Sequence, residues 1–407
     1  MKLIRSSLVV AVLPCAALSC SGTTEPSAPP PLQLTPAEAA TATAANDFAF
    51  ALFAQLAKSQ AGANVFVSPF SASASLSMAM NGAAGGTLTA MRAALRVNAS
   101  SLAEVNASYK GLIDQLRSVD PAVTFQTANS IWYNKSFSFK QSFLDTTKRW
   151  FSAEVRGLDF SDASGSLAAI NGWVSASTNG KIPSILDEVR RDEAMFLINA
   201  TYFKAPWQFR FNPAGTSPAS FFAADGTTQS VPMMTRGEHL SPKFGAGGVG
   251  QLGFVELPYG NRAFAMDIVL GPYKANIDSI AATLTSSVWA GLVASLKDVD
   301  YALVLPKFTM TYDRTLNDDL TALGMGVAFS DAADFSGMSS TAMALEFVRQ
   351  KAFVDVNEDG TEAGASTVTG VIPLSLEEIR VDHPFIFAIR ERSSGAILFM
   401  GKVLRIP

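Results

Sequence analysis

Residues 358–366 read Glu-Asp-Gly-Thr-Glu-Ala-Gly-Ala-Ser, and they are the most informative feature of the chain. It follows an alternating apolar segment at 347–356 and precedes further β-compatible residues at 367–369 and 371–375. A loop of this length normally stays out of a sheet because it carries bulky charges or turn-forming residues. This loop carries almost none, so we predict a segment that can change from loop to strand.

The side chains of a strand point alternately to two faces, and this alternation sharpens the prediction. If the segment were extended, one face would carry only small or β-branched uncharged side chains, namely Thr361, Ala363, Ala365, Thr367, Thr369 and Val371. The single charge would point to solvent on the other face, which carries Glu362, Gly364, Ser366 and Val368. An ordinary flexible surface loop can also show this pattern, so the rest of the chain must distinguish the two interpretations.

Several motifs besides residues 358–366 resemble the serpins, a family whose reactive loop inserts into a β-sheet and whose hinge is similar to this stretch. Residues 64–71 (Asn-Val-Phe-Val-Ser-Pro-Phe-Ser) resemble the start of the family's second helix. Residues 196–204, followed by Trp207, resemble its central strand and the tryptophan at the top of the sheet. The resemblance covers nearly the whole chain after residue 45, because further motifs occur in family order at 305–308, 323–324, 334–337, 383–385 and 399–403.

The resemblance implies the serpin fold, an α+β fold with about nine helices, three β-sheets and an exposed reactive-centre loop that inserts into the large central sheet. The residue patterns agree, because helical signals come early and strand signals come late. Thr35 and Glu38 form a capping box around Pro36, and Ser68 before Pro69 predicts a second helix start by the same logic. A further helix is predicted at 164–178, and strands are predicted at 124–132, 194–203, 264–270, 301–308, 345–356, 385–390 and 397–403.

Composition limits the number of domains and the class of partner. The 407 residues, 48% of them hydrophobic, suffice for one large core or two domains, and the lack of repeats predicts a single domain over residues 35–407. The formal net charge is −4 with both signs interspersed, which argues against a nucleic-acid partner. Some serpins carry a basic glycosaminoglycan-binding helix where this chain has residues 101–118, but only Lys110 and Arg117 are basic there, so no heparin site is expected.

The N-terminus has the features of a secretory signal. Lys2 and Arg5 precede an apolar run at 8–18, which is too short to span a membrane but suits a signal segment. We therefore predict a signal over residues 1–20 and a chain that is secreted across the inner membrane.

The signal ends in Ala-Leu-Ser-Cys, which resembles a bacterial lipoprotein processing site with Cys20 as the lipidated residue. Leucine is more usual where Ala17 stands, so cleavage by ordinary signal peptidase near the same place is the alternative. Residues 21–34, rich in Ser, Thr and Pro, are predicted to form a tether. We expect a cell-envelope lipoprotein of the outer membrane or surface, or an extracellular protein, with membrane contact only through the N-terminal lipid. Both cysteines, Cys15 and Cys20, precede the tether, so the mature body can form no disulfide.

No enzyme motif is apparent in the chain. The patterns HExxH, GxSxG and SxxK are lacking, and two histidines, His239 and His383, cannot build a histidine-rich metal site. Residues 245–250 fit G-x-G-x-x-G, but no clear strand precedes them and no helix signal follows. Residues 355–360 begin like an EF-hand loop, but Ser366 stands where a bidentate Glu is needed. We therefore expect no enzyme activity, no cofactor and no metal site.

The resemblance also implies a mechanism and a scissile bond. Serpins present their loop as bait to a serine protease, or sometimes a cysteine protease, which forms an acyl-enzyme and is dragged along when the cleaved loop inserts. The family's spacing from Glu358 puts the scissile bond between Leu374 and Ser375, in a reactive loop at about 358–382. Counting back from His383 is less secure and can shift the bond by one residue. Leu374 suits chymotrypsin-, elastase- or subtilisin-like targets, and the resemblance implies a monomer.

Other matched positions imply control of the sheet. Ser68, Ser71 and Asn199 align with the polar "shutter" beneath the insertion gap, and Gln350 stands where the family often has a histidine. Glutamine donates and accepts hydrogen bonds but cannot change charge, so a pH-sensitive shutter is not expected. Trp207 is expected where insertion begins, next to the strand end before Glu358. Simple core packing is the alternative role of all these residues.

The main alternative to an inhibitor is a non-inhibitory serpin that acts as a binding or chaperone-like module. Such members usually carry charged, bulky or proline residues in the hinge, and this hinge carries none on the face expected to be buried. A hydrolase on the same scaffold is a third hypothesis, with no motif to support it.

Overall fold

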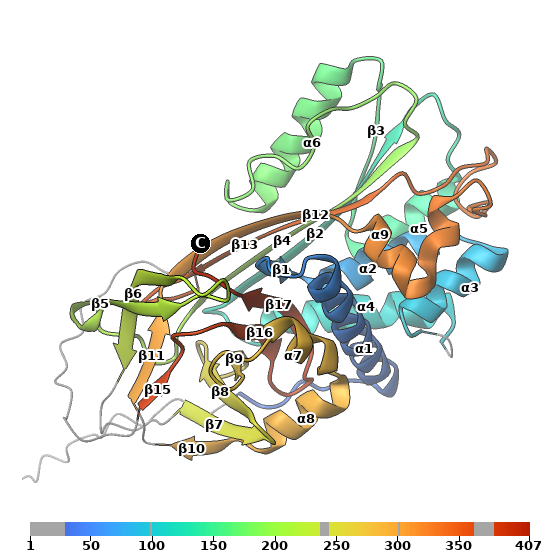
Figure 1. Ribbon diagram of the computed structural model, residues 1–407. Helices are drawn as coiled ribbons and strands as arrows, with labels where there is room; N and C mark the ends of the chain where they lie inside the picture. Colours follow the sequence, from blue (N-terminus) through green and yellow to red (C-terminus); the bar gives the residue numbers. More distant parts are fainter. Residues whose placement is uncertain (1–28, 98–99, 237–243, 300–301, 362–377) are drawn as a thin grey trace, which may run out of the picture.

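The computed structural model describes residues 29–97, 100–236, 244–299, 302–361 and 378–407. Within these ranges, three β-sheets and nine α-helices form the expected α+β fold (Figure 1). The predicted signal with Cys20, most of the tether, the hinge from Glu362 onward and the bond between Leu374 and Ser375 lie outside the described residues.

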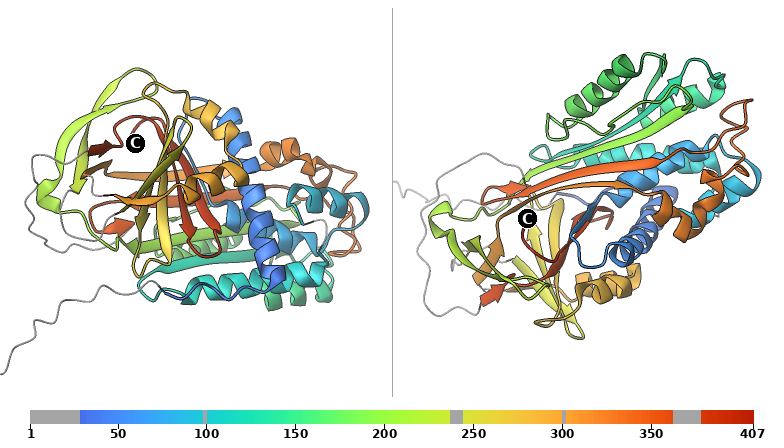
Figure 2. Two further views of the ribbon diagram at one scale, coloured as in Figure 1. Left: turned by 90° about the horizontal axis from the view of Figure 1, so that it is seen from below. Right: turned by 45° about the horizontal axis from the view of Figure 1, so that its top comes forward.

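The six-stranded sheet is built around β4 (Met195–Pro206), which overlaps the strand predicted at 194–203. Most of β4 is buried, because α2 (Pro69–Met80) packs on one face of the sheet and α6 (Ala163–Ser177) packs on the other (Figure 2). The strand order is β12 (Phe308–Thr315), β13 (Val348–Val356), β14 (Gly360–Thr361), β4, β2 (Thr124–Asn134) and β3 (Glu154–Leu158).

Two smaller groups of strands complete the β-structure. The seven-stranded sheet is antiparallel, with the order β1 (Val65–Val67), β17 (Ile397–Val403), β16 (Phe385–Glu391), β9 (Phe264–Leu270), β8 (Leu252–Pro258), β7 (Phe244–Val249) and β10 (Lys297–Val299). The four-stranded sheet has the order β15 (Glu378–Arg380), β11 (Ala302–Pro306), β6 (Thr228–Arg236) and β5 (Ser217–Phe222), and β15 is parallel to β11.

The prediction of a single strand at 301–308 was wrong, because the chain forms two strands there that belong to different sheets. β11 ends at Pro306, and proline has no N–H with which to continue a ladder. The N–H of Lys307 donates to the carbonyl of Pro232 over 2.9 Å, and β12 then begins in the six-stranded sheet. Both halves are apolar, so periodicity alone did not reveal the change of sheet.

The capping box predicted at the first helix is present. The N–H of Glu38 donates to the Thr35 hydroxyl over 3.2 Å, and the N–H of Thr35 donates to the Glu38 carboxylate over 2.7 Å. The other helices, apart from α2 and α6, follow here with their bounds: α1 (Pro36–Ser59), α3 (Gly85–Ala94), α4 (Leu102–Ser118), α5 (Gln141–Phe151), α7 (Ile277–Thr283), α8 (Ser286–Ala294) and α9 (Asn317–Leu320). Among the described residues no single helix is long and apolar enough to cross a membrane, and only the pair α7 and α8, bent by 99°, reaches that length and composition together.

The start of α2 was predicted correctly, but Ser68 does not cap the helix through its side chain. Its hydroxyl makes no capping hydrogen bond and instead donates to the carbonyl of Leu398 over 2.8 Å. All residues of α2 are buried, so the serine joins the helix to β17 in the interior.

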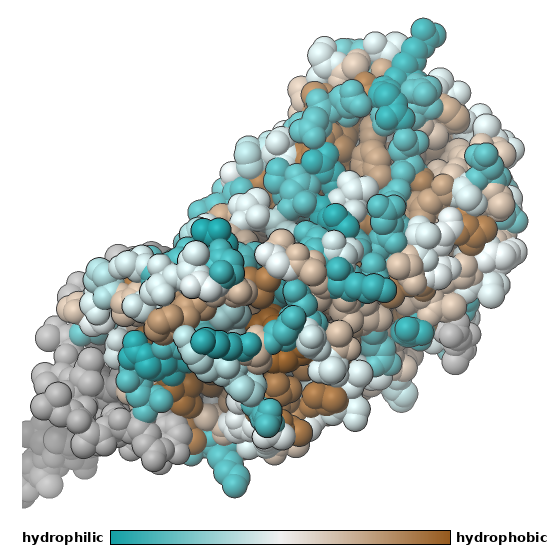
Figure 3. Space-filling model, in the orientation of Figure 1, coloured by the Kyte–Doolittle hydropathy of each residue, from teal (hydrophilic) through white to brown (hydrophobic). Residues whose placement is uncertain are grey.

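Two apolar cores lie on opposite sides of the six-stranded sheet. The main core joins α1 and α2 to this sheet and to the seven-stranded sheet, and Leu32 and Leu34 pack against it. A smaller core, here called the outer core, lies between the other face of the six-stranded sheet and α6, and includes Trp132, Ile170 and Phe196. Polar and apolar side chains are interspersed on the surface seen in Figure 3.

Replacing Phe66 by alanine is expected to cost about 3–5 kcal/mol of stability, because the ring is buried in the main core. It stacks on Phe387 and Phe399 with ring centroids 5.6 and 5.4 Å away. Urea unfolding of Phe66→Ala measures the loss. Phe222→Ala is the matched control, since Phe222 is 37% exposed. Equal midpoints for the two variants would contradict the packing described here.

Candidate functional site

The candidate site begins where the chain turns after β13. Residues 357–359 form the turn, and β14 then runs back antiparallel to the end of β13, with Thr361 opposite Val356. On its other side, β14 pairs with β4, with Gly360 opposite Pro206 and Thr361 opposite Ala205. β14 therefore lies between β13 and β4. Gly360 is required there, because a Cβ would come within 2.1 Å of the Ala205 carbonyl oxygen.

The boundary between β13 and β4, here called the seam, is only partly closed. The two strands pair directly and in parallel from Val348 opposite Leu197 to Ala352 opposite Thr201. β14 fills the far end, and within the described chain no register pairing joins residues 353–355 to residues 202–204. A segment that continued from β14 would meet this interval first.

Thr361 is anchored by aromatic residues at the end of the seam that β14 fills. Its side chain is buried, and its hydroxyl shares a hydrogen bond of 2.6 Å with the hydroxyl of Tyr259. Burial raises the pKa of Tyr259, so the phenol stays protonated. The Tyr259 ring stacks on Trp207 at 4.4 Å, and the indole N–H of Trp207 donates to the carbonyl of Asn357 over 2.9 Å. Trp207 thus lies next to the end of β13, whereas Tyr259 was not predicted.

Ion pairs hold the two acidic residues at the start of the hinge, Glu358 and Asp359. Glu358 forms an ion pair of 2.9 Å with Lys307 and accepts a hydrogen bond of 2.9 Å from Thr216. Burial raises the pKa of Glu358, but the hydrogen bonds from Lys307 and Thr216 outweigh it, so the net pKa lies below its ordinary value. Asp359 pairs with Arg210 at 3.4 Å. Lys307, Thr216 and Arg210 were not predicted, although Lys307 lies inside the motif at 305–308.

Two of the predicted shutter residues form a closed pair beneath the seam. The side chain of Gln350 accepts from the N–H of Ser68 and donates to its carbonyl, both over 2.8 Å. Both residues are buried, Gln350 on β13 and Ser68 at the start of α2. Because neither side chain titrates near neutral pH, this contact is independent of pH in that range.

The other two predicted shutter residues share a second network. The hydroxyl of Thr201 donates to the amide oxygen of Asn199 over 2.9 Å and shares a hydrogen bond of 2.7 Å with the hydroxyl of Ser71. Asn199 in turn donates to Asn129 over 2.9 Å. Since Asn199 lies opposite Gln350 in the strand register, all the predicted shutter residues meet under the closed part of the seam. Thr127, Asn129 and Thr201 were not predicted, although Thr127 also bonds Ser71. Each is a polar residue at an alternate position of a largely apolar strand, and this pattern could have identified them.

The sequence patterns that had been excluded as sites adopt other structures. Residues 245–250 lie at the β7–β8 hairpin, so the glycine pattern is not followed by a helix. Asp355 accepts a hydrogen bond of 2.7 Å from Thr309, which belongs to the neighbouring strand β12. No cluster of three or more His, Cys, Asp or Glu side chains suited to a metal ion occurs in the part of the chain that the structure describes.

Replacing Gln350 by leucine is expected to cost about 1–3 kcal/mol, because the buried N–H of Ser68 loses its partner. The carbonyl of Ser68 retains its bond from the N–H of Ala72 and adds little to the loss. The same substitution at the exposed Gln141 is the control, and urea midpoints measure both. A neutral Gln350→Leu would show that packing alone, without the polar pair, holds the shutter.

Comparison with known proteins agrees with this architecture. The family described as "Serpin (serine protease inhibitor)" matches residues 43–406. An uncharacterized serpin-like protein of Methanosarcina acetivorans is 32% identical over 375 residues, which cover 89% of this chain and 87% of the relative. Neuroserpin of Gallus gallus is 32% identical, with 87% and 88% covered.

Solved structures are similar over the same extent. Thyroxine-binding globulin in complex with thyroxine superposes with a TM-score of 0.81 at 28% identity, covering 90% of this chain and 99% of that one. The thermophilic serpin tengpin in its native state has a TM-score of 0.82 at 28% identity, with 93% and 96% covered.

Proposed function

Because this chain belongs to the serpin family, whose members are generally protease inhibitors, we propose that it is an irreversible suicide-substrate inhibitor of serine proteases. The observation that carries the proposal is the placement of Gly360 and Thr361 between β13 and β4. The residues that follow keep one uncharged face, so they suit a strand that continues along the seam.

In the proposed mechanism the protease attacks the carbonyl of Leu374 and forms an acyl-enzyme with it, while Ser375 leaves as a new amino terminus. The freed segment extends β14 and separates β13 from β4. About a dozen new backbone hydrogen bonds, each contributing roughly 0.5–1.5 kcal/mol, give a drive on the order of 10 kcal/mol. The attached protease is carried along and distorted, so it cannot deacylate. The uninserted state is then kinetically trapped rather than most stable.

The proposed targets are chymotrypsin-, elastase- or subtilisin-like proteases, whose primary pockets accept leucine. A trypsin-like enzyme requires Lys or Arg, and none occurs between Lys351 and Arg380. A cysteine protease forms the same kind of acyl-enzyme and is included in the proposal.

The proposed location is the cell envelope, through a lipid on Cys20, or the extracellular space if the signal is simply removed. The support is the sequence of residues 1–20 and the Ser-, Thr- and Pro-rich composition that follows. Leu32 and Leu34 pack against the body, so the part of the tether that can extend ends before them.

A binding role without inhibition is the second candidate, and the likeness to thyroxine-binding globulin in complex with thyroxine favours it. The uncharged face of the hinge weighs against it, because only a segment that inserts needs such a face.

Incubation of the purified protein with chymotrypsin, elastase and subtilisin tests the proposal. We expect a complex at the summed mass that survives denaturing electrophoresis, and a released peptide that begins at Ser375 by mass spectrometry. Loop cleavage by all three enzymes without any complex would reject inhibition and support the binding role.

Placing a charge on the inserting face is expected to turn the inhibitor into a substrate. Thr361→Arg cannot be accommodated beside Tyr259, and Ala363→Glu puts a charge on the same face without altering the anchored β14. Glu362→Arg is the matched control, because this side chain belongs to the opposite face. The stoichiometry of inhibition, the number of inhibitor molecules consumed per protease molecule blocked, should rise severalfold for the first two variants and remain unchanged for the control. Unchanged values for all three would show that the insertion register is wrong.

A further inference from the structure

Two neighbouring elements at the lower edge of the molecule in Figure 1, α8 and the β7–β8 hairpin, form one surface without charged residues. Residues 279–296, which include α8, contain no Asp, Glu, Lys, Arg or His, and neither do residues 244–255. Gly247 lets the hairpin lie against the end of the helix, because a Cβ there would come within 2.5 Å of the carbonyl oxygen of Ser295. The ring of Trp289 on α8 also contacts Phe254 of β8, with centroids 5.3 Å apart.

The outward side of this surface carries small and apolar side chains. Ala290 and Ala294, one turn apart on α8, are exposed, and Val249 at the tip of the hairpin is 44% exposed. The exposed residues Lys297 and Asp298 follow the uncharged run and mark its edge. The exposed residues of α8 and of the hairpin tip at 248–251 are here called the uncharged face.

The chain enters the described part of the structure beside this face. Residues 29–31, all proline, line one cavity together with Val293 and Leu296 at the end of α8. Leu32 then fixes the chain to the body, since its N–H donates to the hydroxyl of Ser393 over 2.9 Å and its side chain packs against the main core. A group attached to the chain before residue 29 is therefore tethered next to α8.

The tether is short compared with the molecule. Pro29 lies nine positions after Cys20, the proposed site of the lipid. A fully extended chain of that length spans about 30 Å at most. A lipid on Cys20 would thus keep the uncharged face within about that distance of the bilayer that holds the lipid.

Composition alone does not select this face, because α6 is likewise free of charged residues. The two helices lie at opposite edges of the molecule, as Figures 1 and 2 show. The entry point of the chain distinguishes them, since residues 29–31 lie against the end of α8. Of these two uncharged helices, α8 is therefore the one that a lipid on Cys20 would bring to a membrane.

We propose that the uncharged face docks on the surface of a lipid bilayer when Cys20 carries a lipid. The inference rests on the proposed location, because a face whose one large exposed side chain is Val249 buries too little apolar area to bind a bilayer by itself. The lipid makes the contact intramolecular and raises the effective concentration of the face at the bilayer to about the millimolar range. The body then has a preferred orientation, with α6 and the outer face of the six-stranded sheet turned away from the membrane.

A fluorescent dye on a single cysteine measures which side of the body meets the lipid. In the mature lipidated protein the lipid occupies the sulfur of Cys20, and Cys15 leaves with the signal, so one introduced cysteine is the only free thiol. Ala294→Cys places the dye on the uncharged face, and Ala168→Cys places it on α6 as the matched control, since both alanines are exposed. Each protein is reconstituted into vesicles of phosphatidylcholine and phosphatidylglycerol in which some acyl chains carry a nitroxide quencher.

We expect the nitroxide lipids to quench the dye at residue 294 at least threefold more strongly than the dye at residue 168. The difference should persist at high salt, because a contact without charges is not screened. Equal quenching at the two sites, or none at either, would overturn the docking. Quenching at residue 294 that disappears at high salt would also overturn it, because it would assign the contact to cations outside the face, such as Lys297.

A charge placed on the face gives a second measurement. Ala290→Glu lies one turn from residue 294, so its carboxylate should reduce the quenching there at least twofold by opposing burial against the lipid. Ala168→Glu on α6 is the matched control and should leave the quenching unchanged. Urea midpoints of both variants check that the fold is intact. Undiminished quenching in a folded Ala290→Glu protein would show that the face does not contact lipid.

Failure of the proposed location gives a separate signature. Mass spectrometry of the mature N-terminal peptide shows whether Cys20 carries a lipid. A mature chain without lipid rejects the location and, with it, the docking, whereas a lipidated chain with equal quenching at both sites rejects the docking alone. A dye signal at residue 294 that rises with the protein-to-lipid ratio, without quenching by the nitroxide lipids, would assign the face to a second copy of the chain and would also reject the docking.

Discussion

Backbone pairing between β13 and β4 stops partway along these strands, and the rest of the site depends on that interruption. When a buried strand pairs with its neighbour over only part of its length, the remaining backbone groups can still form hydrogen bonds with another strand. β14 occupies only the end of the interval, because its two residues are fixed by the turn at 357–359 and by Tyr259. The residues that already pair keep the sheet stable, and the unpaired interval between β13 and β4 leaves backbone groups with which further residues could pair.

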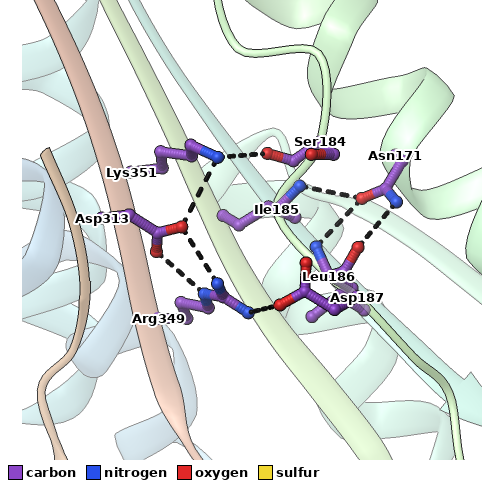
Figure 4. A network of polar contacts seen from close by, with 8 residues as sticks. All are labelled: Asn171, Ser184, Ile185, Leu186, Asp187, Asp313, Arg349 and Lys351. Atoms are coloured by element: carbon purple, nitrogen blue, oxygen red, sulfur yellow. Dashed lines mark hydrogen bonds and ion pairs between the residues drawn. The ribbon is translucent and has the colours of Figure 1, made fainter. Parts of the chain in front are cut away.

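Polar contacts hold the seam from both faces. Beneath it, Gln350 and Ser68 join β13 to α2 through two hydrogen bonds. On the other face, Lys351 of β13 donates to the carbonyl of Ser184, in the chain between α6 and β4 (Figure 4). If the proposed strand forms, each contact is weak compared with the free energy that a full strand would release, but all of them act before that strand has formed. In the proposed mechanism their effect is therefore on the rate of insertion, and that rate sets how long a kinetically trapped fold persists.

The sequence was most informative where a local rule applies. The capping box located α1, and a continuous apolar run located β4. The face predicted from alternation stays a prediction, because most of it lies outside the described residues. Family motifs located Trp207 and the shutter residues, but local rules could not find Tyr259 or Lys307, whose partners Thr361 and Glu358 lie far along the chain. Such contacts arise from the packing of separate sheets, and no periodicity encodes them. The same limit explains the strand that splits at Pro306, since sheet membership is a tertiary property.

The passage from β11 through Lys307 into β12 has a mechanical consequence. The chain on one side of residues 362–377 is bonded to Lys307 through Glu358, and the chain on the other side forms β15, which pairs with β11 just before Lys307. Both ends of the intervening segment are thus attached to one short, continuous stretch of backbone. A pull on β15 passes through its hydrogen bonds to β11 and then along the backbone to Lys307, whose ion pair with Glu358 lies two residues before β14, so the two ends of the segment are mechanically coupled.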